Sequence, residues 1–264
     1  MKGGLIMTDR QGMAMLRDTV ARIERRYQKN AAVLYLETGL PPVDEALKGG
    51  LRRGVVHEFL GEGHDRQLCA RPTRFIAHIL AQAAGPVVWV MPQGEGLALA
   101  GLRRAGLSAE RLLCIEADPS RLAGTVEDVL HSKHVTAVVA DLTEPLSLTA
   151  SRRLTLAAEA SGVTCFLLHR HEHFIPPSAC WTRWRIGAAP SDPVRIGKRA
   201  LLSYPEPFSL TLMRCRGGEA LSWKIGTDHV SSSSFPLAAA MAYNALAKEA
   251  PAGRPGLTVG AVRA

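Results

Sequence analysis

Long apolar runs and cysteines are both scarce in this 264-residue sequence. No apolar run approaches the roughly 20 residues that a membrane-spanning helix needs, and the stretch Met1–Met7 is too short for a signal peptide. The five cysteines are widely spaced and include no Cys-x-x-Cys pair, which argues against a disulfide framework and against a zinc knuckle. We therefore expect a cytoplasmic protein with no membrane segment, whether its true start is Met1 or Met7.

A working phosphate-binding loop is missing as well. Such a loop has the spacing Gly-x4-Gly-Lys-Ser/Thr, so that backbone N–H groups cradle phosphates, the lysine reaches the terminal phosphates and the hydroxyl holds Mg²⁺. Counted from Gly61, the last three of those positions are Arg66, Gln67 and Leu68. The sequence thus predicts a nucleotide-binding scaffold that has lost its nucleotide chemistry. The alternative is that Arg66 binds the phosphates in place of the lysine.

Two neighbouring features agree with that loss. Pro72 cannot occupy a helix interior, so the helix after the loop should begin near Ala70–Pro72. This start is about four residues late and displaces the helix N–H groups by about 6 Å. In addition, Glu62 and Asp65 place carboxylates where phosphate oxygens would lie, and such repulsion amounts to about 1 kcal/mol in water and several when less solvated.

Residues 8–30 have the pattern of an amphipathic helix. Thr8 and Gln11 fit a capping box, and the helix should end at Lys29-Asn30. Apolar residues recur every three or four positions in a narrow stripe, namely Met13, Leu16, Val20, Ile23 and Tyr27. A stripe of this width favours docking in a groove of a partner or self-association. Packing against its own domain is the alternative.

Apolar strand-like runs then alternate with helical segments, which is typical of a parallel, doubly wound α/β sheet. After a strand leading into Gly61, further strands are expected at residues 87–91, 112–115, 135–141 and 163–168, with helices at 73–84, 97–105, 119–130 and 150–160. Residues 182–186, 208–215 and 221–225 alternate like antiparallel strands. We predict an N-terminal helical arm at 1–34, a core at 35–230 and a tail at 231–264 that is partly helical, then disordered.

The formal net charge of +8 suits nucleic acid or another anionic partner, and equally a solvated basic surface. A short run of two tryptophans and two arginines combines the stacking rings and cations found in single-strand-binding proteins. Alternation along a strand puts Trp184 in the core and Arg183 with Arg185 on the opposite face. Those arginines either contact DNA or form ion pairs with Asp141 or Glu144.

One stretch, His169-Arg-His-Glu-His173, has the residue types of a metal site. Its histidines are two residues apart, and their side chains share a face if the chain is extended. No other residues with ligand spacing accompany it. We therefore favour a polar loop and expect no metal.

Several of these motifs, in this order, resemble the core of RecA-type recombinases over about residues 10–225. The matching stretches are Leu36–Gly39, Val43–Leu47, Gly49–Gly54, Leu112–Asp118, Val138–Asp141 and Ser151–Leu154. Three further blocks resemble the ImuA family, RecA-like proteins encoded with the Y-family-polymerase-like protein ImuB: Thr149–Val163, Thr182–Ser191 and Arg214–Gly218. The resemblance implies a RecA-like fold.

The same resemblance allows the catalytic positions to be compared. Where RecA-type enzymes carry a water-activating glutamate, this chain has Gln93, which cannot take a proton, and Glu95 would need a register shift. Asp141 matches the Mg²⁺-linked aspartate but has no loop hydroxyl to share the metal with. Its alternative role is a strand-end acid that caps a helix or binds an arginine. The γ-phosphate sensor position falls near His169-Arg170. We expect no catalytic residue and no cofactor, with Asp141 vestigial.

RecA-type proteins place DNA-contacting loops at the carboxyl edge of the sheet, so Arg170 joins Arg183 and Arg185 as a candidate DNA contact. The resemblance implies a non-catalytic accessory protein of damage-induced translesion mutagenesis. Its expected partners are ImuB, then RecA, an error-prone replicative-type polymerase and DNA. The alternatives are a DNA-dependent ATPase with a degenerate loop and a damage-induced cell-division inhibitor.

Overall fold

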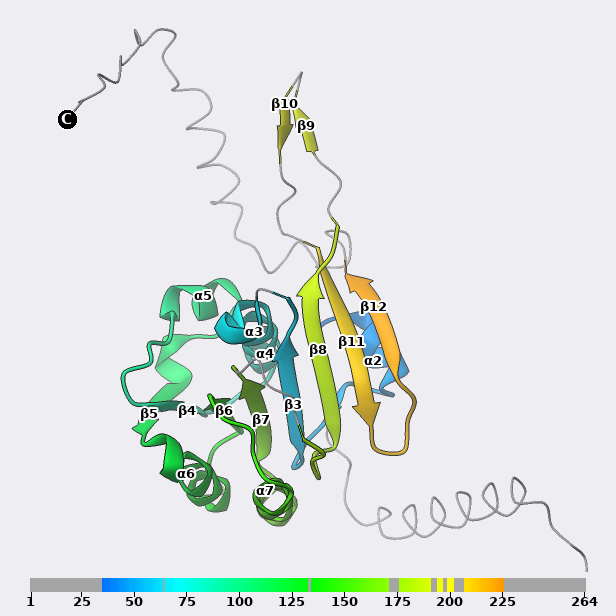
Figure 1. Ribbon diagram of the computed structural model, residues 1–264. Coiled ribbons are helices and arrows are strands. Elements are labelled where there is room, and N and C mark those ends of the chain that lie inside the picture. The colour runs from blue at the N-terminus through cyan, green and yellow to red at the C-terminus, as the bar shows by residue number, and fades with distance from the viewer. Residues whose placement is uncertain are drawn as a thin grey trace, which may run out of the picture.

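The computed structural model describes residues 35–63, 65–132, 134–170, 176–190, 194–196, 199–201 and 207–225. Its main sheet is built from β3 (Val56–Gly61), β4 (Val87–Pro92), β5 (Leu112–Ala117), β6 (Ala137–Leu142), β7 (Thr164–His169), β8 (Thr182–Ala188), β11 (Phe208–Cys215) and β12 (Leu221–Ile225). The strand order is β12-β11-β8-β3-β7-β6-β4-β5 (Figure 1).

The sheet is parallel from β8 to β5 and antiparallel at its other end. β3 lies between β7 and β8 and is parallel to both, while β11 is antiparallel to β8 and to β12. The predicted α/β sheet with antiparallel strands at the C-terminal edge is therefore confirmed. One detail is corrected, because the strand predicted at 182–186 is antiparallel only to β11 and completes the parallel part of the sheet beside β3.

The four longer helices lie where the apolar periodicity predicts them, with shifted ends, whereas the short helix at Asp65–Leu68 was not predicted. The principal ones are α4 (Ala70–Gln82), α5 (Leu99–Arg104), α6 (Pro119–His131) and α7 (Leu148–Ser161), and two short ones are α2 (Pro41–Ala46) and α3 (Asp65–Leu68). Local signals fix the ends: Asp118 and Ser147 accept from backbone N–H groups as N-caps, and Gly162 ends α7 in the left-handed conformation with φ 80°.

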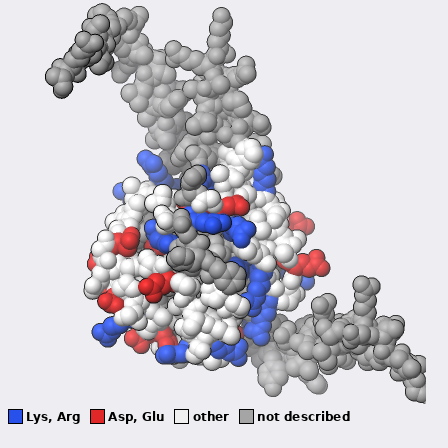
Figure 2. Space-filling view, in the orientation of Figure 1, with Lys and Arg blue, Asp and Glu red and all other residues white. Residues whose placement is uncertain are grey.

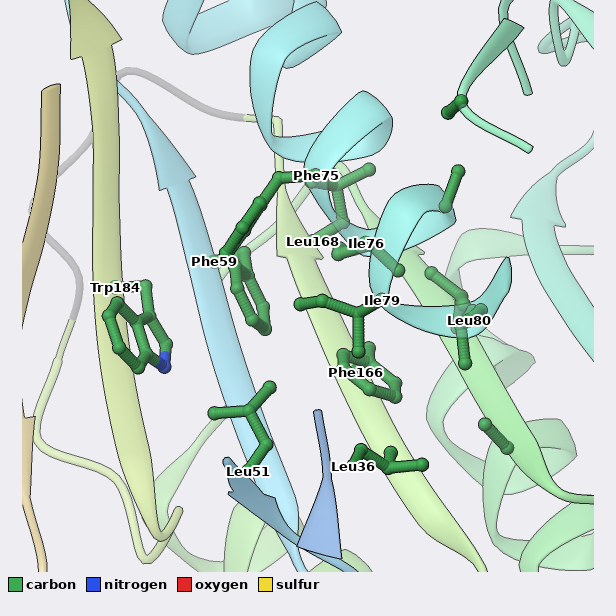
Figure 3. Close-up of a cluster of buried hydrophobic side chains, with 14 of the residues drawn as sticks. Leu36, Leu51, Phe59, Phe75, Ile76, Ile79, Leu80, Phe166, Leu168 and Trp184 are labelled. Carbon is green, nitrogen blue, oxygen red and sulfur yellow. The ribbon is translucent and has the colours of Figure 1, made fainter. Parts of the chain in front are cut away.

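Two apolar clusters cover the two faces of the sheet. In one, Phe75, Ile76, Ile79 and Leu80 of α4 point toward the strands, as Figure 3 shows. In the same cluster the Phe59 ring stacks on Trp184, with centroids 6.3 Å apart. The other cluster joins α6 and α7 to the opposite face. Full burial of such a side chain stabilises the fold by about 1.5–3 kcal/mol.

Two small strand pairs were not predicted. β1 (Tyr35–Leu36) pairs with β2 (Leu51–Arg52), and β9 (Val194–Ile196) pairs with β10 (Arg199–Leu201). Gly50 permits the first pair, because its φ of 113° suits glycine and an added Cβ would lie 2.2 Å from the Leu36 carbonyl oxygen.

The predicted N-terminal helix with its stripe Met13, Leu16, Val20, Ile23 and Tyr27 lies outside the described residues, as does the predicted tail at 231–264. Within the described part of the chain, no helix has the length and apolar character needed to cross a membrane.

Candidate functional site

The turn after β3 is folded tightly against the end of that strand. β3 ends at Gly61, and an added Cβ there would lie 2.1 Å from the backbone oxygen of Asp65. α3 follows and exposes Arg66, Gln67 and Leu68 to solvent. α4 then begins at Ala70, which confirms the late helix start predicted from Pro72.

The Asp65 carboxylate occupies the N-terminus of α4. Its Oδ1 accepts from the backbone N–H of Ala70 at 2.8 Å and its Oδ2 from that of Arg71 at 2.9 Å. The residue is buried, with 5% of its surface exposed. Free N–H groups at a helix N-terminus bind anions, and here a carboxylate of the protein itself accepts from two of them.

Glu62 behaves differently from Asp65. The expectation that both carboxylates lie among the phosphate positions is wrong for Glu62, which is exposed and extends over β8. Its Oε2 lies 2.0 Å from where a Cβ on Gly187 would be. The absence of a side chain at Gly187 is what leaves room for it.

Asp141, at the end of β6, is held by Arg170. The arginine Nε lies 2.5 Å from Asp141 Oδ1, and its Nη1 donates to the Leu68 carbonyl oxygen at 3.1 Å. Burial raises the pKa of Asp141 above its usual range, and Glu95 adds to this while Arg170 opposes it. Of the two roles weighed for Asp141, the contacts match an acid that binds a nearby arginine.

The turn after β4 carries two exposed polar residues. Gln93, at the position where a water-activating glutamate would stand, is exposed to solvent, as is Glu95. The Gln93 backbone N–H donates to the Ala117 carbonyl oxygen at 3.1 Å, which fixes the turn after β4 beside β5.

A second buried polar group was not predicted. Glu58, in the middle of β3, is 2% exposed and accepts from Arg183 Nε at 2.7 Å and from Ser178 Oγ at 2.8 Å. His169 Nε2 lies 3.4 Å from its other carboxylate oxygen. Burial acts to raise the pKa of Glu58, but hydrogen bonds and charge from His169 and Arg183 outweigh it and lower the pKa to about 2.

The structure therefore gives internal partners to two of the three candidate DNA contacts. Arg170 binds Asp141, and Arg183 binds Glu58, which corrects the suggested pairing of Arg183 with Asp141 or Glu144. Arg185 is half-buried, and no described carboxylate lies within ion-pair distance of it. That these three arginines contact DNA stays a prediction. Trp184 is fully buried, as alternation predicted.

The possible metal cluster is only partly described. His169 is buried beside Glu58, whereas His171 and His173 lie outside the described residues. Among the residues that the structure does describe, no three histidine, cysteine or acidic side chains are grouped as metal ligands.

Most of the described cysteines are buried. Burial raises the pKa of Cys69 to about 12, and its Sγ lies 3.0 Å from the His169 carbonyl oxygen. Cys165 and Cys180 are buried too, with pKa values raised by burial. Cys114 lies in an apolar strand-like run, which favours a buried thiol, but it is exposed because β5 is an edge strand.

The sheet is mostly parallel, has helices on both faces and carries antiparallel strands at one edge. A turn and a helix follow β3, the first strand of this sheet in the chain, which lies near its centre. These features define a RecA-like α/β core. No protein-family model matches the sequence. Two curated relatives match the sequence, both named Protein ImuA, from Caulobacter vibrioides strain NA1000 and strain ATCC 19089. Each is 32% identical to this chain over 220 residues, and the match covers 76% of this chain and 86% of the relative. The chain belongs to the ImuA family.

Proposed function

We propose that this protein is a non-catalytic accessory factor of DNA-damage-induced translesion mutagenesis that acts by binding ImuB. RecA, an error-prone replicative-type polymerase and DNA are its further proposed partners. Membership of the ImuA family supports the role in mutagenesis. The contacts around the degenerate loop support the non-catalytic part of the proposal.

The observation that carries the proposal is the Asp65 carboxylate on the α4 N-terminus, within 2.9 Å of two backbone N–H groups. A phosphate bound there would have to displace a buried carboxylate or lie against it. Two like charges about 4 Å apart repel by about 4 kcal/mol near a protein surface. Magnesium would face a second competitor, because Arg170 already holds Asp141.

Calorimetric titration of the purified protein with ATP and with ADP, with and without Mg²⁺, tests the non-catalytic part. We expect no binding heat at concentrations where P-loop enzymes saturate, and no phosphate release with single-stranded DNA present. ATP turnover that disappears in Asp141→Ala would overturn the proposal and favour a DNA-dependent ATPase.

A pull-down with ImuB tests the partnership. Leu16→Asp/Ile23→Asp replaces two residues of the apolar stripe, and deletion of residues 231–264 removes the tail. We expect each change to weaken capture of ImuB. Ala14→Asp/Ala21→Asp is the matched control, because helical periodicity places both alanines opposite the stripe. Full capture by the stripe variant and the deletion would remove both segments as docking surfaces.

A further inference from the structure

One half of the main sheet has a face without a helix among the described residues. On the α4 side, β8 and β11 bury Trp184, Ile186, Leu210 and Leu212. On the other side, α6 and α7 pack over β4, β6, β7 and β3. In Figure 1 no described helix lies between the viewer and the strands β8, β11 and β12.

Strand register identifies which side chains share this outer face. Arg183 lies beside Arg214 and Arg185 beside Thr211. On the next strand, Ser222 lies beside Thr211 and Lys224 beside Ser209. Directly paired residues point to the same face of a sheet. The outer face thus carries mostly cations and hydroxyl groups, together with the Glu62 carboxylate that lies over Gly187. We call it the basic face after its remaining residues, which are Arg183, Arg185, Ser209, Thr211, Arg214, Ser222 and Lys224.

The basic face carries more positive than negative charge, and most of its cations have no ion-pair partner among the described residues. Glu58 neutralises Arg183, but no described carboxylate lies within ion-pair distance of Arg185, Arg214 or Lys224. Arg214 donates to the Ser178 carbonyl oxygen at 2.6 Å, a neutral acceptor that orients the guanidinium and leaves its charge unpaired. Figure 2 shows the result as a band of Lys and Arg where Figure 1 places β8 and β11.

The basic face continues into an aromatic and cationic stack next to β8. The guanidinium carbons of Arg52 and Arg216 lie 4.3 Å and 5.3 Å from the centre of the Trp181 ring. Arg216 also approaches Glu159 at 3.9 Å, but both side chains are nearly half exposed, so this ion pair is weak. Planar guanidinium groups held over an indole offer stacking surfaces to bases as well as charge to phosphates.

This combination of features favours one class of ligand. A flat face has no protruding helix to enter a duplex groove. Cations at alternate strand positions are about 6.7 Å apart, which suits an extended backbone of regularly spaced charges. Hydroxyl groups between the cations supply hydrogen-bond donors for phosphate oxygens. An acidic peptide would use the cations but not the Arg52–Trp181–Arg216 stack.

We infer that the basic face, with the stack at Trp181, binds single-stranded DNA, and that Arg185, Arg214 and Lys224 contact its phosphates. The inference deepens the DNA part of the proposed function and names its surface. It does not use the degenerate loop, the N-terminal stripe or the tail.

Fluorescence anisotropy of a labelled oligothymidylate, measured over a range of salt concentrations, tests the inference on the full chain. The variant Arg185→Gln/Arg214→Gln/Lys224→Gln should bind about 10- to 100-fold more weakly near physiological salt. The slope of log affinity against log salt should become shallower by about 2, because three phosphate contacts are lost.

A second triple variant supplies the control. Arg103→Gln/Arg104→Gln/Arg121→Gln removes the same charge from exposed positions on α5 and α6, near the opposite edge of the sheet. It should leave affinity and salt slope nearly unchanged. If Arg214→Gln disturbs folding, Arg185→Gln/Lys224→Gln tests the same face, since neither side chain makes a hydrogen bond with the described residues.

Equal weakening by both triple variants would mean that overall charge, and not this face, drives binding, and would overturn the inference. Unchanged binding by the first triple would do so as well, and a duplex bound as tightly as the single strand would refute the choice of ligand. Capture of ImuB by the same variants separates the two proposals. Retained capture with lost DNA binding supports the basic face and leaves the partnership with ImuB intact.

Discussion

Removing the Asp65 carboxylate provides a direct test of how the α4 N-terminus is stabilised. Asp65→Ala deletes two backbone hydrogen bonds, to the N–H groups of Ala70 and Arg71. Truncating a helix cap lowers stability by about 0.5–2 kcal/mol, and hydrogen bonds to charged groups lie at about 1.5–3 kcal/mol each. Because Asp65 is only 5% exposed, water compensates little.

We therefore expect Asp65→Ala to lower the free energy of unfolding by about 3 kcal/mol, equivalent to a fall in Tm of about 6–12 °C. Asp65→Asn keeps an acceptor oxygen and should lose about half as much. Urea unfolding followed by tryptophan fluorescence measures both. Urea is preferable to guanidinium because it leaves ionic strength unchanged.

A second expectation distinguishes an occupied anion site from an ordinary cap. In Asp65→Ala the helix N–H groups become free for a small anion, so inorganic phosphate should restore part of the lost stability. At ten times its dissociation constant, phosphate would return about 1.4 kcal/mol. Wild type and Asp65→Asn, measured at the same phosphate concentrations, correct for the general stabilising effect of phosphate.

Two results would refute this reasoning. A loss below about 0.5 kcal/mol, which is the range of an ordinary surface substitution, would show that the carboxylate contributes little to the helix start. An identical phosphate response in wild type and Asp65→Ala would show that the vacated position does not bind anions.

Two further predictions concern stability. The pKa of Glu58 falls from 4.5 to about 2 on folding. The ionised carboxylate therefore contributes about 3 kcal/mol to the free energy of unfolding above pH 4.5, and this contribution is lost as pH falls toward 2. Urea unfolding at several pH values should show the loss, and Glu58→Gln should abolish this pH dependence. Gly50→Ala should destabilise the fold by about 2 kcal/mol or more, because the backbone there has φ 113° and the added Cβ would meet the Leu36 carbonyl oxygen. Gly124→Ala, inside α6 with nothing within 4 Å of the added Cβ, should stabilise it by about 0.5–1 kcal/mol. Thermal melts of the two alanine variants measure both effects, and a reversed order of the two melting temperatures would contradict this account.

The sequence predicted those features that depend on neighbouring residues. Apolar periodicity located the strands of the parallel part and the helices α4, α5, α6 and α7, and Pro72 predicted the late start of α4. Alternation correctly assigned Trp184 to the core, because the side chains of a strand point to opposite faces by geometry alone.

The buried polar contacts were beyond sequence reasoning because their members are distant in the chain. Glu58 and Arg183 are 125 residues apart, and they meet only because β8 inserts beside β3. A charged residue within the apolar run Val55–Leu60 was the available signal, since a buried carboxylate requires a partner. Nothing in the local pattern identified which cation that partner would be.

The direction of Glu62 and the exposure of Cys114 both depend on the order of the strands in the sheet. Whether a strand lies at the edge or in the interior depends on sheet order, which periodicity does not encode. The run containing Cys114 is apolar enough for a central strand, yet β5 lies at the end of the sheet and pairs only with β4.

The position of β3 also has a consequence for synthesis. Both of its neighbours come much later in the chain, since Val56 pairs with Cys165 and His57 with Thr182. At roughly 5–20 residues per second, the ribosome needs about 5–20 s to make the intervening hundred or so residues. Throughout that interval an apolar segment emerges without its hydrogen-bonding neighbours, so the nascent chain should depend on chaperones most strongly before β7 has been translated.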